Sequence, residues 1–313
     1  MKKYLSIFVI LTLTLSILSL SSCEVFSKDR TLSIGVYESV VNGELTETVA
    51  AIVTEEDGTI VLCRLDAVTY SPAVDAYGEP IIAVPKTVSE QGGTVYEQMR
   101  RFEEYAVGKT VGELLEEFNP SDSSPYFYET SADYVLLIPG FISPGHYAAA
   151  IERADKNEYK TAFRSKNLEC AVAMFLEPSA PTFPEPSTDK STMSLTLTGS
   201  FAAVAASGGK IAGAIIDANE VVLTVTHASD GTLTVIEKSS QGTKLEQGED
   251  YGMDDYNPYA IGDWYEQAGA YVKALGGIKT EGLETELPEN TAGCTIDTDS
   301  YRAALKKAAA RTK

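Results

Sequence analysis

The chain carries two copies of one sequence pattern, and this duplication restricts its fold more than any other feature. The first copy has "DGTIVLCRLDA" at 57–67, and the second has "GGKIAGAIIDA" at 208–218. In both copies a Gly precedes an Asp by the same interval, and a pair of alanines lies upstream. Further matches follow in the same order: Tyr77-Gly78 with Tyr251-Gly252, the stretch from Thr94 with that from Asp263, and the stretch from Gly145 with that from Asp299. A conserved order of matches indicates tandem duplication of one structural unit.

Each copy begins with strand patterns and ends with helix patterns. An apolar run after a glycine turn is typical of a hairpin that feeds a strand, and the later matches have helical apolar periodicity. We therefore expect an α+β fold with two tandem related units, each a mainly antiparallel sheet with helices following.

A proline-rich stretch separates the copies. Residues 177–192 read "EPSAPTFPEPSTDKST", and their four prolines favour an extended spacer over a helix or a central strand. We expect the first unit at 32–176, the linker at 177–192 and the second unit at 193–313. The segment Asp155–Leu176, with the alternating "LECAVAMFL", is compatible with a last strand or a last helix of the first unit.

The first residues have the layout of a secretory signal. Two lysines follow the first residue, residues 4–20 are mainly apolar, and small residues precede Cys23. The ending "LSSC" resembles the lipobox of bacterial lipoproteins, which is cleaved before its cysteine. The resemblance implies that residues 1–22 are a signal peptide, that Cys23 carries lipid, and that 23–31 tether the protein to the extracytoplasmic face of the cell membrane. The alternative is an uncleaved anchor with an incidental cysteine.

The charge balance argues against two kinds of partner. The chain has 45 acidic and 25 basic residues, a formal net charge of -20. Binding to nucleic acid depends on neutralising phosphates with Lys and Arg, and anionic lipid attracts basic surfaces. We therefore expect no nucleic-acid partner, and membrane contact only through the lipid on Cys23.

Three cysteines remain once Cys23 is assigned to lipid, namely Cys63, Cys170 and Cys294. An odd number cannot pair completely, and no C-x-x-C is present. The sequence therefore indicates neither a disulfide framework nor a metal site, and one disulfide among the three stays open.

Two Tyr-Glu-Gln stretches resemble binding-site residues, but the spacing of each glutamate from the residue three positions before it has a local structural explanation. Thr94 precedes Glu97 by three residues, and Asp263 precedes Glu266 by three. This is the spacing of a capping box at the start of a helix. We therefore expect both glutamates to close back on the cap residue, with a direct ligand contact as the alternative.

A glycine turn precedes the last predicted helix. Thr298 is a good N-cap residue, and Asp299 suits the first turn. Just before them, Gly293 permits a sharp turn and Thr295 offers a hydroxyl. A turn beside a helix N-terminus can receive a phosphate, although most glycine turns before helices are only turns.

Several of these features together resemble the FMN-binding domain family. They are the lipobox, the "DG-x-I" hairpin, the "YGM" from Tyr251, the "WYEQA" from Trp264 and the Gly-x-Thr turn. The family includes the C subunit of sodium-pumping NADH:quinone reductase and lipid-anchored flavoproteins of extracellular electron transfer in Gram-positive bacteria. The resemblance covers both units, the second more closely. It implies that FMN is joined through its phosphate to the hydroxyl of Thr295, with Trp264 and Tyr265 near the isoalloxazine.

The family motif reads Asp-x-x-(Ser/Thr)-Gly-Ala-(Thr/Ser). Gly293 and Thr295 match it, whereas Glu289, Ala292 and Cys294 depart from it.

The corresponding stretch of the first unit departs further. It keeps Gly140 but has Phe141 and Ile142 where the last two motif positions fall. Because no hydroxyl stands there, we expect no covalent flavin on the first unit. Ser143 and Pro144 instead predict an N-cap and a first helical residue.

Two functions compete on this evidence. The first is an extracytoplasmic, membrane-anchored lipoprotein that carries FMN on Thr295 for electron transfer at the cell surface. The second is a cofactor-free surface binding or scaffold lipoprotein of the same fold. A hydrolase is disfavoured, because the chain has no Ser-His-Asp signature and no histidine pair for a metal. We therefore expect an electron carrier or a binding protein rather than a catalyst.

Overall fold

The computed structural model describes most of the chain after residue 27. The described ranges are 28–74, 80–82, 86–119, 142–165, 167–178, 192–227, 233–283, 287–288 and 291–312. The expected signal peptide and most of the expected tether and linker lie outside these ranges. In the described part of the chain, no helix is long and apolar enough to cross a membrane.

The first sheet has four antiparallel strands in the order β3-β2-β1-β6. They are β1 (Lys28–Val41), β2 (Glu44–Thr54), β3 (Ile60–Tyr70) and β6 (Thr161–Ser165). Asn42 and Gly43 form the loop from β1 to β2, with φ of 53° and 79°. A two-residue Asn-Gly loop with positive φ at both positions matches the twist of the paired strands, so this hairpin is fixed locally.

The second sheet also has four antiparallel strands, in the order β10-β9-β8-β7. They are β7 (Glu169–Pro178), β8 (Thr192–Ser207), β9 (Lys210–His227) and β10 (Leu233–Thr243). A separate two-stranded ribbon pairs β4 (Pro72–Val74) with β5 (Pro80–Ile82). The predicted α+β class with two mainly antiparallel sheets is confirmed.

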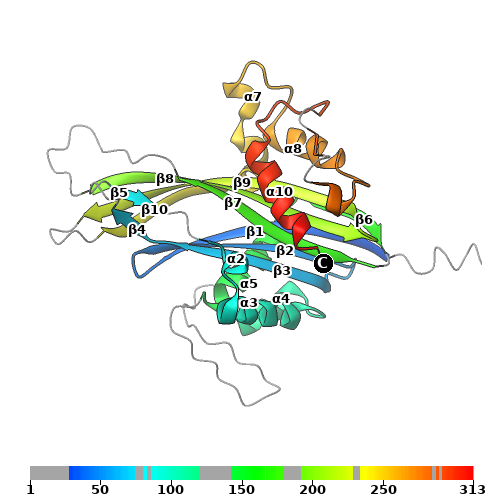
Figure 1. Ribbon diagram of the computed structural model, residues 1–313, viewed down its shortest axis with the longest axis horizontal. Coiled ribbons are helices and arrows are strands. Elements are labelled where there is room, and N and C mark those ends of the chain that lie inside the picture. Colours follow the sequence, from blue (N-terminus) through cyan, green and yellow to red (C-terminus); the bar gives the residue numbers. More distant parts are fainter. Residues whose placement is uncertain are drawn as a thin grey trace, which may run out of the picture.

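Helices cover the outer face of each sheet (Figure 1). Those of the first unit are α2 (Val88–Gln91), α3 (Gly93–Ala106), α4 (Val111–Glu117) and α5 (Pro144–Lys156). Those that follow the second sheet are α6 (Lys244–Gln247), the 3-10 turn η1 (Gly248–Tyr251), α7 (Met253–Tyr256), α8 (Trp264–Lys273), the 3-10 turn η2 (Thr280–Gly282) and α10 (Asp299–Ala310). The resulting layers run helix, sheet, sheet, helix.

The two sheets share one hydrophobic core. Val49 and Tyr70 of the first sheet belong to the same buried cluster as Leu197 and Val225 of the second sheet. A second cluster fills the space between the first sheet and α3 to α5. Burying a large apolar side chain contributes about 1.5–3 kcal/mol, so the face-to-face packing joins the two units into one body.

The duplication is visible in the strand pairing. Ala50 of β2 lies opposite Gly35 of β1, and Ala202 of β8 lies opposite Ala173 of β7. On their other sides, β2 and β8 pair with β3 and β9. Strands β1 to β3 therefore correspond to β7 to β9, and α2, α3 and α5 correspond to α6, α8 and α10.

The boundary between the units differs from the predicted one. The sequence places residues 169–176 at the end of the first unit, yet β7 pairs with β8 in the second sheet. Within Asp155–Leu176, left open between strand and helix, the structure shows the end of α5, then β6 in the first sheet, then β7 in the second. A strand with buried residues on both faces takes its partner from long-range packing, which the local pattern does not reveal.

The predicted capping box at Thr94 and Glu97 is wrong. Helix α3 starts at Gly93, its N-cap is Gly92 with φ of 65°, and Thr94 lies inside its first turn. Glu97 is exposed. The positive φ of Gly92 lets the chain enter the helix earlier than a threonine cap would allow.

Three other predicted helix starts are confirmed. Asp263 and Glu266 form a capping box at α8, where Glu266 Oε2 accepts the Asp263 N–H at 3.2 Å. Ser143 is the N-cap of α5 with Pro144 at its first residue. Thr298 is the N-cap of α10, although its side chain makes no capping hydrogen bond.

Candidate functional site

The predicted flavin-acceptor turn connects the region of α8 to the start of α10. Gly293 has φ of 84°, and the Cys294 N–H donates to the Thr291 carbonyl at 3.1 Å. Thr295 is exposed. Its N–H and its hydroxyl both donate to Oε1 of Gln267, at 2.6 and 2.9 Å. The turn is therefore closed on itself and attached to α8.

Gln267 is the residue that the sequence reasoning missed at this turn. Its side chain is buried, and its Nε2 donates to the Gly262 carbonyl at 2.8 Å, which leaves Oε1 facing Thr295. The available signal was the repeated Tyr-Glu-Gln. The glutamate of that stretch in the second unit, Glu266, caps α8, whereas the neighbouring glutamine holds the turn.

A shallow groove runs beside the turn. Its volume is about 570 Å³, and its lining includes Lys273, Ile278, Pro288, Thr291 and Ala292. The lysine is exposed and brings a positive charge to a largely apolar lining. Such a groove suits a flat ring system that carries an anionic group.

The two predicted aromatic residues lie away from this groove. Trp264 is only 2% exposed, and its ring centroid is 5.8 Å from that of Tyr301. Tyr265 packs against Tyr159, with ring centroids 4.7 Å apart. Neither side chain lines the groove beside Thr295. Trp264 belongs to the core of the second unit, and Tyr265 to a contact between the two units.

Three buried polar atoms around the turn have no hydrogen-bond partner among the described residues: Tyr271 Oη, Thr291 Oγ1 and Arg302 Nε. Burial raises the pKa of Tyr271 to about 12, so its phenol keeps its proton and remains a donor at neutral pH. Donors near a helix N-terminus favour an anion such as a phosphate. These atoms are buried, and Arg302 also pairs with Asp299 at 3.6 Å. The exposed groups that could meet the phosphate of FMN are the Thr295 hydroxyl and Lys273.

Comparison with protein-family models, with curated protein sequences and with solved structures finds no match for the chain.

A second polar cluster lies between the two sheets, and no sequence pattern predicts it. Asn219 Nδ2 donates to Oε1 of Glu38 at 2.6 Å and to Oε1 of Glu47 at 2.7 Å. The Tyr70 hydroxyl donates to Glu47 Oε2 at 2.9 Å, and Lys238 Nζ lies 3.0 Å from Glu38 Oε2. The cluster draws residues from both sheets, so it links the two units through polar contacts as well as apolar ones.

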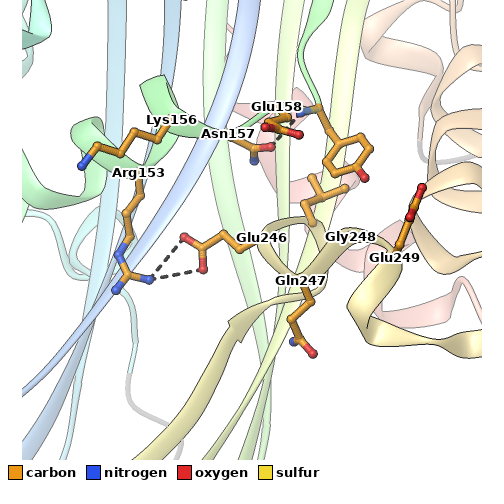
Figure 2. A pocket seen from close by; sticks show the side chains of 10 residues that line it. Arg153, Lys156, Asn157, Glu158, Glu246, Gln247, Gly248 and Glu249 are labelled. Carbon is orange, nitrogen blue, oxygen red and sulfur yellow. Dashed lines mark hydrogen bonds and ion pairs between the residues drawn. The ribbon is translucent and has the colours of Figure 1, made fainter.

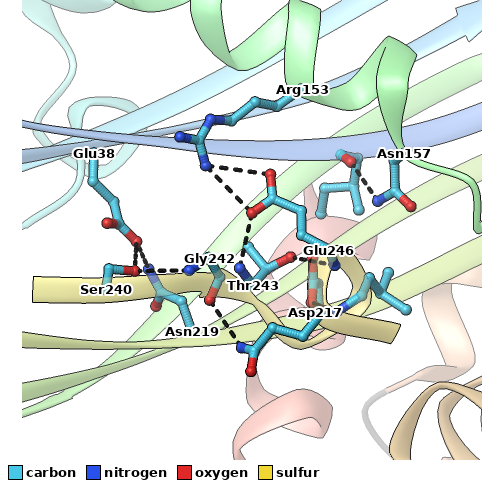
Figure 3. Close-up of polar contacts among 12 residues, drawn as sticks. Glu38, Arg153, Asn157, Asp217, Asn219, Ser240, Gly242, Thr243 and Glu246 are labelled. Atoms are coloured by element: carbon cyan, nitrogen blue, oxygen red, sulfur yellow. Dashed lines mark hydrogen bonds and ion pairs between the residues drawn. The ribbon is translucent and has the colours of Figure 1, made fainter. Parts of the chain in front are cut away.

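Burial dominates the electrostatics of this cluster. Burial raises the pKa of Glu47 to about 7, since its effect is larger than the lowering by the hydrogen bonds from Asn219 and Tyr70. The negative charge of Glu38 raises the pKa further. Figure 3 shows Glu38 with its hydrogen-bond donors Asn219 and Ser240. The Ser240 hydroxyl donates to Glu38 Oε1 at 3.1 Å. Both glutamates are buried, while Asn219 and Ser240 also line a cavity of about 300 Å³.

The remaining predicted positions are placed as follows. Cys63 and Cys170 are buried, Cys294 is half-buried, and all three are free thiols. Cys23 and Glu289 lie outside the described residues. In the described part of the chain, no three side chains are grouped to hold a metal ion.

Proposed function

We propose that this protein is an extracytoplasmic lipoprotein, anchored to the cell membrane through Cys23, that carries FMN on Thr295 for electron transfer. The lipobox-like ending at Cys23 supports the lipid anchor, and the Gly293–Thr295 turn supports the attachment of FMN. The observation that carries the flavin proposal is the exposed Thr295 on a closed glycine turn, beside a groove with Lys273.

Each residue of the turn has a role in this proposal. Gly293 gives the backbone the left-handed conformation that exposes the acceptor. Gln267 fixes the turn by holding the Thr295 N–H. The exposed Lys273 offsets the charge of the phosphate. FMN, when bound, would supply the redox chemistry.

The test is to produce the chain in a bacterial host that has the flavin transferase. We expect a yellow protein whose flavin fluorescence survives denaturing electrophoresis. Thr295→Val removes the acceptor hydroxyl and should give a colourless protein. Thr295→Ser is the matched control, because it keeps a hydroxyl at the same position and should remain yellow. A colourless wild-type protein from that host would contradict covalent attachment.

A cofactor-free binding or scaffold lipoprotein is the second candidate, and one contact favours it. The Thr295 hydroxyl already donates to Gln267 Oε1. Esterification would remove that proton and the hydrogen bond, which is worth about 1 kcal/mol. If the wild-type protein is unmodified and does not bind free FMN in a titration, this second function is the one supported.

A further inference from the structure

Asp66 and Asp217 occupy equivalent places in the two units. Both are fully buried. Each accepts the N–H of the residue that follows it, at 2.9 and 2.8 Å. Each also accepts a backbone N–H from the short helix packed beside it, from Ser89 of α2 and Leu245 of α6, both at 3.1 Å. The duplication has therefore preserved a buried carboxylate and its backbone donors.

In the first unit the carboxylate has a cationic partner. Arg311, at the end of α10, places Nη1 2.7 Å from Asp66 Oδ2. The same nitrogen donates to the Val172 carbonyl at 3.1 Å. The Ser89 hydroxyl donates to Oδ2 as well, at 2.6 Å. A guanidinium group from the second unit thus neutralises the buried aspartate of the first.

In the second unit the equivalent position lacks the cation. Asn157, at the end of α5, corresponds to Arg311. Its Nδ2 donates to the Ile34 carbonyl at 3.0 Å, as Arg311 does to the Val172 carbonyl. No part of Asn157 bonds to the carboxylate, and Oδ2 of Asp217 has no hydrogen-bond partner among the described residues.

The surroundings leave Asp217 short of positive charge. Burial raises the pKa of Asp217 to about 7, since its effect is larger than the lowering by the Thr243 hydroxyl and the backbone donors. The negative charge of Glu246 raises the pKa further. Arg153 is paired with Glu246 at 3.3 Å, so its charge is already engaged (Figure 3).

A groove opens beside Asn157 (Figure 2). Its volume is about 560 Å³, and Asn157, Tyr159 and Leu245 are among the residues that line it. The charged residues of the lining are Glu158, Glu246, Glu249, Arg153 and Lys156. The two cations are engaged in ion pairs, Arg153 with Glu246 and Lys156 with Glu152. Leu245 donates its N–H to Asp217, so the fully buried carboxylate lies directly behind this wall of the groove.

We propose that this groove binds the guanidinium group of a small organic cation, which occupies beside Asp217 the place that Arg311 occupies beside Asp66. A guanidinium is planar and can donate to the carboxylate and to a carbonyl at once. Glu158 and Glu249 attract a cation to the groove, and the ring of Tyr159 offers it an aromatic face. The site lies apart from the Thr295 turn and does not depend on a flavin.

The test is calorimetric titration of the full chain with agmatine, at a pH above the pKa of Asp217. We expect saturable binding of agmatine and none of butylurea, a neutral compound of similar shape. Asp217→Asn should weaken agmatine binding at least about tenfold, equivalent to about 1.4 kcal/mol. This variant should fold, because Asn resembles the protonated aspartic acid in shape.

A second variant places a guanidinium group of the protein itself in the site. Asn157→Arg restores the residue found at the equivalent place in the first unit, and should abolish agmatine binding. Thr94→Arg is the matched control, since it adds the same charge at an exposed position of α3 outside the groove, and should bind as the wild type does. Absence of saturable binding, full binding by Asp217→Asn, or an equal loss in Thr94→Arg would each overturn the proposal.

Discussion

Glu47 shows how a single buried carboxylate couples stability to pH. Its pKa is raised from the ordinary value of 4.5 to about 7, chiefly by burial. In the pH interval between these values the folded protein holds a proton that the unfolded chain has released. Stability therefore falls as the pH rises through this interval. Burial raises the pKa of Glu103 and of Asp217 to about 7 as well, so they act in the same direction.

We predict that Glu47→Gln makes the stability of the protein less dependent on pH. The variant keeps the shape of the side chain but no longer titrates, so one proton fewer is linked to unfolding. Urea unfolding at a series of pH values between about 4.5 and 8 should show a shallower decline for the variant than for the wild type. Glu116→Gln, at an exposed helix position, is the control and should leave the slope unchanged. Equal slopes in all three proteins would show that Glu47 does not titrate as described.

At the scale of elements, the contact between β1 and α5 depends on a glycine. A Cβ built on Gly35 would overlap the backbone of Ala154 and Ala150 in α5. Gly35 needs no unusual backbone angle, so its role is the close approach of helix to strand. The corresponding residue of the second unit is Ala173, which indicates that α10 needs no such close approach to β7 at this position.

We expect Gly35→Ala to destabilise the protein by about 3 kcal/mol or more, because a backbone contact cannot move aside as a side chain can. Urea unfolding measures the loss. The control is Gly112→Ala in α4, where an added Cβ meets only the Thr110 hydroxyl, at 4.0 Å. That variant should match the wild type or gain up to about 1 kcal/mol. A Gly35→Ala protein as stable as the control would disprove the close contact.

The elements that the sequence predicted well are those fixed by neighbouring residues. The hairpin around Gly208 and Gly209 and the capping box of α8 follow from local patterns, and the structure contains both. The placement of β7 was missed because its partner strand is chosen by packing across the whole molecule. The Gly293–Thr295 turn was predicted from its motif, whereas the Glu47 cluster joins residues too far apart in sequence to signal one another.

At the scale of the whole molecule, the two units are held together symmetrically. Lys307 at the end of α10 pairs with Glu90 of the first unit, at 2.8 Å. The equivalent Arg153 at the end of α5 pairs with Glu246 of the second unit, at 3.3 Å. Together with the shared core, these reciprocal contacts make the duplicated chain one body rather than two domains on a linker. In the proposed function only the second unit carries covalent flavin, and the first unit is a scaffold, a partner surface or a non-covalent site.

One measurement, the intact mass of the full-length chain, tests both the lipid anchor and the flavin. The chain is extracted from the membranes of a bacterial host that has lipoprotein processing and the flavin transferase. The proposal predicts a chain that starts at Cys23, carries lipid, and is heavier by one FMN less one water. The Thr295→Val variant should show the same lipidated chain without the flavin mass. A wild-type chain that retains residues 1–22, or that lacks the flavin mass, would contradict the account of a lipid-anchored flavin carrier.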